Sequence, residues 1–368
     1  MIIKSIELKN FRNYENLSIS FDKGTNILYG DNAQGKTNVL EAAYLSGTTK
    51  SHKGSKDKEM IRFGEQEAHI RTFVEKKQLK TAQVKSYQID MHLKQNRSKG
   101  IAINKIPIKK ASELFGILNI VFFSPEDLNI IKNGPTERRR FLDSELCQLD
   151  KIYLSDLANY NKILNQRNKL LKDMVYRPDL SDTLPIWDMQ LAETGKKIIR
   201  RRKQFVEELN EIVREIHFKI SGGREQLVLK YEPNTEEGFF EDILQKANVR
   251  DLKSGTTSVG PHRDDMLFSV GNIDIRKFGS QGQQRTSALS LKLSEIELVK
   301  RTIHDTPILL LDDVLSELDS NRQNYLLNSI SDIQTLITCT GLDEFVKNQF
   351  QIHKTFEVIE GSVTERHG

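Results

Sequence analysis

Residues 26–45 read NILYGDNAQGKTNVLEAAYL, and this stretch decides the fold of the chain. It contains the pattern GxxxxGKT at Gly30, Gly35, Lys36 and Thr37. The apolar residues before the loop predict a strand, and those after it predict a helix. A loop of this kind turns backbone amides, a lysine and a hydroxyl toward phosphates and Mg²⁺. The stretch therefore predicts a site for ATP and Mg²⁺ rather than a glycine-containing turn that matches by accident.

The residues expected to contact the nucleotide form one continuous segment. Backbone amides of the loop would cradle the phosphates, and Lys36 would neutralise the β and γ oxygens as one of the catalytic residues. Thr37 would supply the hydroxyl ligand of Mg²⁺. The predicted nucleotide-binding residues of the loop are Gly30, Asp31, Asn32, Ala33, Gln34, Gly35, Lys36, Thr37 and Asn38.

A phosphate loop needs a carboxylate at the end of a neighbouring buried strand, and two segments offer one. Residues 121–127, VFFSPED, end in acids, but Pro125 removes an amide at the tip of that strand. Residues 308–313, ILLLDD, predict a parallel strand that is buried on both faces and ends in adjacent acids. We expect Asp312 to bind Mg²⁺ and Asp313 to orient the attacking water. The alternative is a core strand with a solvated acidic end.

The long separation between Lys36 and Asp312 requires a large insertion between neighbouring strands. An ABC-type ATPase with an inserted arm satisfies this requirement better than a compact kinase or GTPase does. Such an enzyme also needs a signature loop that opens a helix and reaches the nucleotide of a partner subunit. Residues 280–283 fit that role because a capping box precedes an amphipathic helix, although any capped helix has this pattern. The predicted signature residues are Ser280, Gln281, Gly282 and Gln283.

Two segments after Asp313 complete the pattern of an ABC-type site. Residues 316–319, SELD, occupy the place where ABC subunits touch across the nucleotide. Residues 336–340, LITCT, predict a strand whose end usually holds a histidine. Threonine hydroxyls there can hydrogen-bond a phosphate or a water, but they cannot act as a general base. We therefore expect slow hydrolysis.

The composition is that of an ordinary soluble chain. Its 368 residues are 37% hydrophobic, and no stretch approaches the roughly 18 to 20 apolar residues that a membrane-spanning helix needs. From Ile3 onward the chain alternates like a strand and shows no export signal. Cys147 and Cys339 form no CxxC pair, which argues against a zinc site or a disulfide framework. We expect a cytoplasmic protein that makes no membrane contact, and the net charge of +4 permits nucleic-acid binding without proving it.

The segments outside the phosphate loop predict two lobes and an arm. Short alternating segments at 69–74, 87–93 and 100–106 predict antiparallel strands. A further hairpin is expected at 266–277, around the pair Gly271-Asn272. We predict an α/β fold with a parallel core sheet and an antiparallel subdomain.

The middle of the chain lacks strand patterns, and its apolar spacing is helical. Two such runs, 153–174 and 192–216, are separated by prolines at 178 and 185. They predict two antiparallel helices in a short coiled-coil-like arm. We therefore predict an inserted helical arm domain at 126–219, within a discontinuous head formed by 1–125 plus 220–368.

Seven ordered segments of the chain resemble the RecF family, whose members are SMC-like ATPases of the ABC type. The resemblance covers nearly the full length, which makes it far more specific than a single phosphate loop. The segments are LKNFRNY (8–14), GDNAQGKTN (30–38), FFSPEDLNIIKNGPTERRRFLD (122–143), LNQRNKLLK (164–172), SVGPHRDD (258–265), GSQGQQRT (279–286) and LLLDDVLSELD (309–319).

The resemblance implies an SMC-like head with two lobes and a short helical domain. It also implies ATP-dependent homodimerisation, slow DNA-stimulated hydrolysis, and binding to double-stranded and gapped DNA. The implied partners are the mediator proteins RecR and RecO, which load a recombinase onto single strands. By analogy with SMC heads, Arg12 and Asn13 are expected at the nucleotide, although a plain turn is the alternative.

Two departures from the wider ABC pattern concern hydrolysis. Ser124 and Pro125 lie where SMC relatives carry a glutamine that senses Mg²⁺, and Asp313 replaces the usual glutamate. Both leave the timing of hydrolysis open, but they do not affect the expectation of nucleotide binding. A stand-alone kinase or GTPase, or a structural DNA-binding protein with a degenerate site, are the rival readings. Against a degenerate site stand the intact residues Lys36, Thr37, Asp312 and Asp313.

Two runs of cations are candidates for contact with DNA. They are 138–140, three arginines, and 200–203, three arginines and a lysine preceded by Lys196 and Lys197. Such runs can meet a phosphate backbone, although a solvated helix face is the usual explanation. The role of residues 262–265, HRDD, stays open, since one histidine among acids more often belongs to a polar loop than to a metal site.

Overall fold

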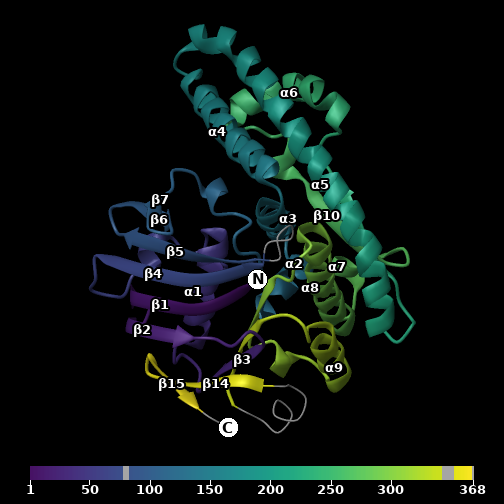
Figure 1. Ribbon diagram of the computed structural model, residues 1–368. Helices are drawn as coiled ribbons and strands as arrows, with labels where there is room; N and C mark the ends of the chain where they lie inside the picture. Colours follow the sequence, from purple (N-terminus) through teal and green to yellow (C-terminus); the bar gives the residue numbers. More distant parts are fainter. Residues whose placement is uncertain (78–82, 342–351, 367–368) are drawn as a thin grey trace. The chain divides into compact units, whose positions relative to one another are not determined.

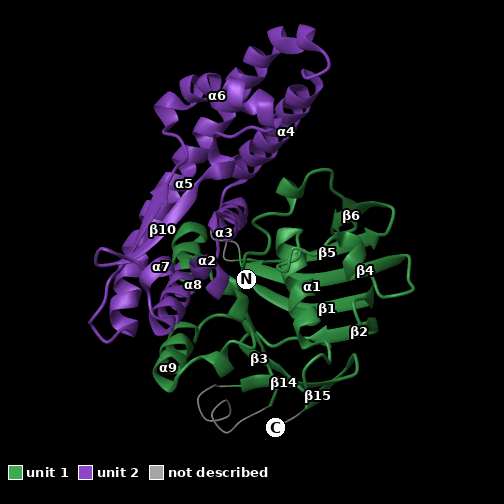
Figure 2. Ribbon diagram, turned by 180° about the vertical axis from the view of Figure 1, so that it is seen from behind, with its two compact units in different colours: residues 1–127, 295–368 green, residues 128–294 purple. Residues whose placement is uncertain are grey.

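The computed structural model describes residues 1–77, 83–341 and 352–366. The described chain forms two compact units, which Figure 2 shows in different colours. Unit 1 consists of residues 1–127 and 295–368, and unit 2 consists of residues 128–294. Within the described residues, no helix combines the length and the apolar character that a membrane crossing requires.

Unit 1 contains an antiparallel sheet with the strand order β2-β1-β4-β5-β6-β7. Its inward side chains alternate with exposed ones, as in a sheet with one buried face. The predicted strands are present, but the third ends at Ile103 because Asn104 and Lys105 take left-handed turn conformations. The strands are β1 (Ile2–Phe11), β2 (Tyr14–Ser20), β4 (Glu67–Lys77), β5 (Val84–Lys94), β6 (Arg97–Ile103) and β7 (Ile106–Pro107).

The second sheet of unit 1 is largely parallel, with the order β15-β14-β3-β13-β12-β8. Strand β12, between β13 and β8, is buried except at its last residue, as its run of branched apolar residues predicts. Only β15 runs antiparallel to its neighbour, and it forms a hairpin with β14. The strands are β3 (Thr25–Tyr29), β8 (Ile120–Phe123), β12 (Ile308–Asp312), β13 (Thr335–Cys339), β14 (Ile352–Ile359) and β15 (Ser362–Arg366).

Helix α1 (Lys36–Thr48) packs between the two sheets of unit 1 and contacts β4, β8 and β12 (Figure 1). Its apolar residues Val39, Leu40 and Leu45 are completely buried in the common core. Because β3 leads directly into the loop before α1, the loop lies at the carboxyl edge of the parallel sheet. The ends of β12 and β13 reach the same edge, which is where α/β sheets place their ligand sites. The remaining elements of unit 1 are η1 (Asp57–Met60), η2 (Ala111–Glu113), η3 (Pro125–Asp127), η7 (Leu315–Glu317) and α9 (Ser320–Ser329).

Unit 2 is built around two long antiparallel helices, α4 (Lys151–Asp173) and α5 (Leu184–Ile220). The proline-containing turn between them forms η4 (Pro178–Thr183), and Pro185 lies in the first turn of α5, where its missing amide costs no hydrogen bond. Figure 1 shows the two helices side by side. The other helices are α2 (Leu128–Lys132), α3 (Pro135–Leu149), η5 (Glu237–Phe239), α6 (Phe240–Ser254), η6 (Pro261–Arg263), α7 (Ile275–Phe278) and α8 (Gln281–Ile303).

Unit 2 extends further along the chain than the predicted arm, 126–219. A small sheet, β9 (Leu227–Glu232) with β10 (Asp265–Val270) and β11 (Ile273–Asp274), packs with α5, and so does α6. These elements bury their apolar faces against the helices and therefore belong to the same compact unit. Helix α8 begins in unit 2 and ends in unit 1.

The predicted hairpin at 266–277 is present only in part. Gly271 has a φ of 59° in the turn, and Val270 pairs with Ile273 across it. The second strand ends at Asp274, because its carboxylate accepts the amides of Arg276 and Lys277 and so starts the short helix α7. The expected strand over 273–277 is therefore wrong beyond Asp274.

Two arginines that interrupt the apolar spacing of the long helices are buried ion-pair centres. Arg167 is fully buried and donates to Asp188 at 2.7 Å and to Asp251 at 2.9 Å. Arg202 donates to Asp143 at 2.8 Å and to Asp264 at 2.9 Å. Both arginines therefore lie on the buried face that the spacing predicts, with carboxylates in place of apolar neighbours.

The segment 258–265 supplies carboxylates to Arg202 and to Arg138 of α3 within unit 2. Asp265 accepts two hydrogen bonds from the buried guanidinium of Arg138, and Asp264 is itself completely buried. His262 bonds the Tyr160 hydroxyl at 2.7 Å and the Thr257 carbonyl at 3.0 Å. Among the described residues, no group of three or more His, Cys, Asp or Glu could hold a metal ion. The acidic pair is therefore structural, and it fixes Arg138 and Arg202 inside the unit.

Candidate nucleotide-binding site

The loop that joins β3 to α1 has a conformation that only glycine tolerates at two positions. Gly30 and Gly35 have φ values of 146° and 114°. A Cβ at Gly30 would lie 2.3 Å from the Val358 carbonyl oxygen, and one at Gly35 would lie 2.4 Å from Asn13 Nδ2. Helix α1 starts without a side-chain cap and has no acid in its first turn. Its free amides and its dipole therefore favour the binding of an anion at this end.

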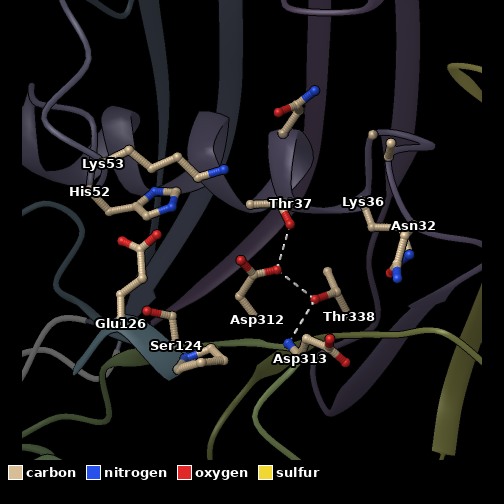
Figure 3. A pocket seen from close by; sticks show the side chains of 14 residues that line it. Asn32, Lys36, Thr37, His52, Lys53, Ser124, Glu126, Asp312, Asp313 and Thr338 are labelled. Carbon is tan, nitrogen blue, oxygen red and sulfur yellow. Dashed lines mark hydrogen bonds between the residues drawn. The ribbon is translucent and has the colours of Figure 1, made fainter. Parts of the chain in front are cut away.

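Lys36 points back into the loop, where its charge is held by carbonyl groups. Its Nζ donates to the carbonyls of Gly30 at 2.6 Å and Asp31 at 2.7 Å. The side chain is almost completely buried although it carries a charge. Because a buried ammonium needs acceptors, this geometry keeps a cation next to the free amides of α1. Figure 3 shows Lys36 and Asn32 on one side of Asp312.

The end of β12 contributes a carboxylate that links three elements. Asp312 Oδ1 accepts a hydrogen bond from Thr37 Oγ1 of α1 and another from Thr338 Oγ1 of β13, each at 2.7 Å (Figure 3). One hydroxyl and one carboxylate therefore converge at the start of α1. Hard oxygen donors of this kind suit Mg²⁺, which takes one or two protein ligands and completes its shell with phosphate and water. Thr37 and Asp312 are thus the residues that fit the predicted metal.

Asp313 follows directly in the chain but has a different environment. Its φ is 54°, and its amide donates to Thr338 Oγ1 at 3.1 Å, which turns the residue at the end of the strand. Burial and the neighbouring charge of Asp312 raise the pKa of the Asp313 carboxyl above its ordinary value. A carboxylate with a raised pKa is a better proton acceptor than an ordinary one.

Two residues at this edge, His52 and Lys53, were not anticipated from the sequence, whereas Ser124 and Glu126 belong to the segment 121–127 that offered the second acidic strand end. Figure 3 shows His52, Lys53 and Glu126 on the side of Asp312 that lies away from Lys36. His52 stacks on Phe122 with the ring centroids 4.0 Å apart, and burial lowers its pKa to about 4. A histidine with this pKa is neutral at pH 7. The sequence gives only one indication of His52 and Lys53: both follow shortly after the end of α1, where the chain comes back to the edge of the sheet.

One pocket of unit 1 collects six of the nine predicted loop residues together with both predicted acids, Asp312 and Asp313. Gly30, Asp31 and Gln34 do not line it, although they belong to the same loop. The lining residues are Asn32, Ala33, Gly35, Lys36, Thr37, Asn38, His52, Lys53, Ser124, Pro125, Glu126, Asp312, Asp313 and Thr338.

The turn after β1 contacts the phosphate loop through only one of its two predicted residues. Arg12 forms two hydrogen bonds of 2.7 Å with the buried carboxylate of Glu41 and does not line the pocket. Although burial acts to raise the pKa of Glu41, hydrogen bonds from Arg12 and Ser51 hold it below its ordinary value. Asn13 donates to the carbonyl of Gln34 at 2.9 Å, so it touches the loop backbone.

The predicted signature residues lie in unit 2, at the start of α8. The predicted capping box is present, because Ser280 N donates to Gln283 Oε1 at 2.9 Å and Gln283 N donates to Ser280 Oγ at 3.2 Å. Gln281 and Gly282 are exposed in the first turn of the helix. Unit 1 alone thus assembles the phosphate loop with Asp312 and Asp313, while the exposed first turn of α8 belongs to the other unit.

Comparison with known proteins gives matches along nearly the whole chain, and they agree with the family resemblance found in the sequence. It is 75% identical over 363 residues to the DNA replication and repair protein RecF of Agathobacter rectalis, with 99% of each chain covered. It is 60% identical to the RecF protein of Lachnospira eligens, with both chains fully covered. A sequence model of the RecF/RecN/SMC amino-terminal domain matches residues 2–362.

Solved structures agree with this assignment at the level of the fold. A structure described as the recombination mediator protein RecF-ATP in the RecFOR pathway matches with a TM-score of 0.91 at 37% identity, covering 99% of this chain and 97% of that one. The Smc head domain of Pyrococcus furiosus matches with a TM-score of 0.56 at 16% identity, which indicates a related fold. The chain therefore belongs to the RecF family.

Proposed function

We propose that this protein is a cytoplasmic, ATP-dependent DNA-binding protein of recombinational gap repair and a weak ATPase. The observation that carries the proposal is the convergence of Lys36, Thr37, Asp312 and Asp313 on one pocket at the carboxyl edge of the parallel sheet. Relatives named for DNA replication and repair, and a structural match described as RecF-ATP, support the choice of nucleotide and process.

The side chains of the pocket divide the work of ATP hydrolysis. Thr37 and Asp312 would hold Mg²⁺, which when bound neutralises charge on the phosphates. Lys36 would move its donors from the loop carbonyls to the β and γ oxygens. Asp313, with its raised pKa, would orient a water and accept its proton. Thr338 donates to Asp312 through its hydroxyl and accepts the amide of Asp313, so it fixes the two acids relative to each other.

Two copies of the chain would close over the nucleotide. The phosphate loop and acids lie in unit 1, whereas the exposed, capped start of α8 lies in unit 2. In an ABC-type dimer, Ser280 and its neighbours would meet the γ-phosphate held by the partner. The dimer would act as a clamp on double-stranded and gapped DNA and work with the mediators RecR and RecO.

Of the two cationic runs, only the exposed members are available for DNA. Arg138 and Arg202 are buried in ion pairs, and Arg201 pairs with Asp150 at 3.1 Å. Arg140 is exposed on α3, and Arg200 and Lys203 are exposed on α5, where Arg200 also pairs with Glu237. A phosphate backbone would therefore be met by these exposed positions rather than by the complete runs.

A binding series with ATP and Mg²⁺ tests this function most directly. The protein is titrated with gapped, duplex and single-stranded DNA in the presence and absence of nucleotide. We expect ATP-dependent binding that favours gapped or duplex DNA, and loss of nucleotide binding in the Lys36→Met variant. Charge reversal at Arg200 and Lys203 should flatten the salt dependence of DNA binding. Equal affinity for all DNAs with and without ATP would refute the proposed function.

A further inference from the structure

The phosphate loop is held from outside by the turn of the β14–β15 hairpin. Glu360 N donates to the side-chain oxygen of Gln34 at 2.5 Å, and Gly361 N donates to the main-chain oxygen of Gln34 at 3.2 Å. Gln34 lies between the pocket-lining residues Ala33 and Gly35 but does not line the pocket itself. Its side chain is therefore engaged on the outer side of the loop.

The turn after β1 holds the same loop from another side. Asn13 Nδ2 donates to the Gln34 main-chain oxygen at 2.9 Å, and Asn13 Oδ1 accepts Asn38 Nδ2 at 2.8 Å. The hydroxyl of Tyr14 donates to the Gly35 carbonyl at 3.1 Å. The carbonyls of Gln34 and Gly35, the last two before α1, thus both accept hydrogen bonds from residues that do not line the pocket. We call Asn13, Gln34, Glu360 and Gly361 the collar.

Close contacts leave the collar little room to adjust. Gly361 has a φ of 76°, and a Cβ on it would lie 3.2 Å from the Asn13 carbonyl oxygen. In the same hairpin, the Val358 carbonyl oxygen lies 2.3 Å from the position that a Cβ on Gly30 would take. A side chain added at Gly361 would therefore press on Asn13, which itself bonds the loop.

We infer that Gln34 and the hairpin turn are positioning elements of the nucleotide site and that Gln34 is not a nucleotide ligand. Phosphate binding requires several loop amides to converge on one point, and a loop ordered before binding loses less entropy when the ligand arrives. The collar provides that order from two elements distant in the sequence. The inference rests on the proposed nucleotide function and adds to it a control of ATP affinity by the carboxyl-terminal hairpin.

Gly361→Ala tests the collar without changing any residue of the pocket. Gly271→Ala is the matched control, because Gly271 also lies in a hairpin turn with positive φ, 59°, and has no atom within 4 Å of the added Cβ. Titration of the full chain with Mg-ATP should give a Kd raised by roughly three- to tenfold for Gly361→Ala, the loss of about one hydrogen bond. Gly271→Ala should bind ATP like the wild type.

Gln34→Met keeps the length of the side chain but removes the acceptor for Glu360 N, so it provides a second test. Both variants disrupt the same collar. The double variant Gln34→Met/Gly361→Ala should therefore weaken ATP binding no more than the stronger single variant. At saturating ATP the turnover of Gly361→Ala should stay near that of the wild type, with the loss confined to KM.

Each outcome separates the inference from the function on which it rests. Wild-type ATP affinity in both single variants, or fully additive losses in the double variant, would overturn the role of the collar. If the wild type itself fails to bind ATP, the proposed function fails instead. A Gly361→Ala chain that does not fold leaves the decision to Gln34→Met, whose unaltered Kd would also overturn the inference.

Discussion

At the scale of single residues, two adjacent acids have different properties because their surroundings differ. Asp312 accepts two hydroxyl hydrogen bonds, which hold its carboxylate between α1 and β13. The carboxyl of Asp313 has a raised pKa, caused by burial and by the charge of Asp312. Adjacent acids with such different surroundings are suited to different roles, which is why we propose Asp312 as the Mg²⁺ ligand and Asp313 as the proton acceptor.

Asp313→Asn should therefore bind Mg-ATP while its hydrolysis falls by about 10²- to 10⁴-fold, the usual range for a lost general base. In the wild type, turnover should decline on acidification at a higher pH than for an ordinary carboxyl, because protonation of Asp313 removes the acceptor. A pH profile of kcat under saturating ATP measures this. A rate that stays constant down to the ordinary carboxyl pKa of 3.8 would contradict the assignment.

The buried arginine of α4 should matter more for stability than any exposed cation. Arg167→Leu leaves Asp188 and Asp251 buried without their partner, which typically costs about 3 to 5 kcal/mol of unfolding free energy. Arg140→Gln, which breaks an exposed pair with Glu137, should leave the unfolding midpoint unchanged. Urea unfolding of both variants provides the comparison. Similar midpoints for the two would show that the buried pairs do not support unit 2.

His262 should make the fold sensitive to mild acid. Burial lowers its pKa to about 4, compared with 6.5 ordinarily, so on acidification the unfolded chain binds the proton first. The stability contributed by neutral His262 is present above pH 6.5 and is lost as the pH falls toward 4. His262→Gln should therefore lose less stability between pH 7 and 5 than the wild type. Parallel pH dependences of the unfolding midpoint would rule this out.

At the scale of elements, periodicity predicts helices and strands well where one face is buried. The two long helices and the strand at 308–312 follow their patterns because burial is decided locally along each element. The short helix α7 was not predicted, because the alternation of apolar residues at 273–277 indicates a strand. The side chain of Asp274 caps the helix instead and so decides the local structure. The burial of Arg138 and Arg202 within their runs could not be predicted, because a buried guanidinium needs carboxylates from distant segments, which spacing along the chain does not show.

The packing of α5 against α6 depends on a glycine inside a helix. An alanine at Gly195 would place its Cβ 2.3 Å from the ring of Phe240 and 3.1 Å from the ring of Tyr160. Replacing glycine in a helix usually stabilises it by ~1 kcal/mol, but the overpacking here should cost about 1 to 3 kcal/mol and reverse the sign. Glu193→Ala, at an exposed position of the same helix, is the control. A Gly195→Ala variant that melts above the wild type would show that the helices separate easily.

At the scale of the whole molecule, the site is assembled from segments that the sequence places far apart. The loop motif and the acids after β12 could be paired from the sequence, because parallel strands end at a common edge. The place of His52 in the site could not be predicted, since it depends on the path of the chain after α1 and on stacking with the ring of Phe122. The hydrogen bonds from the β14–β15 hairpin to Gln34 could not be predicted from the sequence either, because their donors are main-chain amides.

The central claim is that ATP joins two copies of the chain, with the start of α8 in one copy completing the pocket of the other. Sedimentation velocity of Asp313→Asn with saturating Mg-ATP tests it, because this variant should bind nucleotide and hydrolyse it too slowly to release the partner. We predict the mass of a dimer with ATP and of a monomer without it, and monomers for Ser280→Arg and Lys36→Met. An Asp313→Asn chain that remains monomeric while saturated with ATP would contradict the claim.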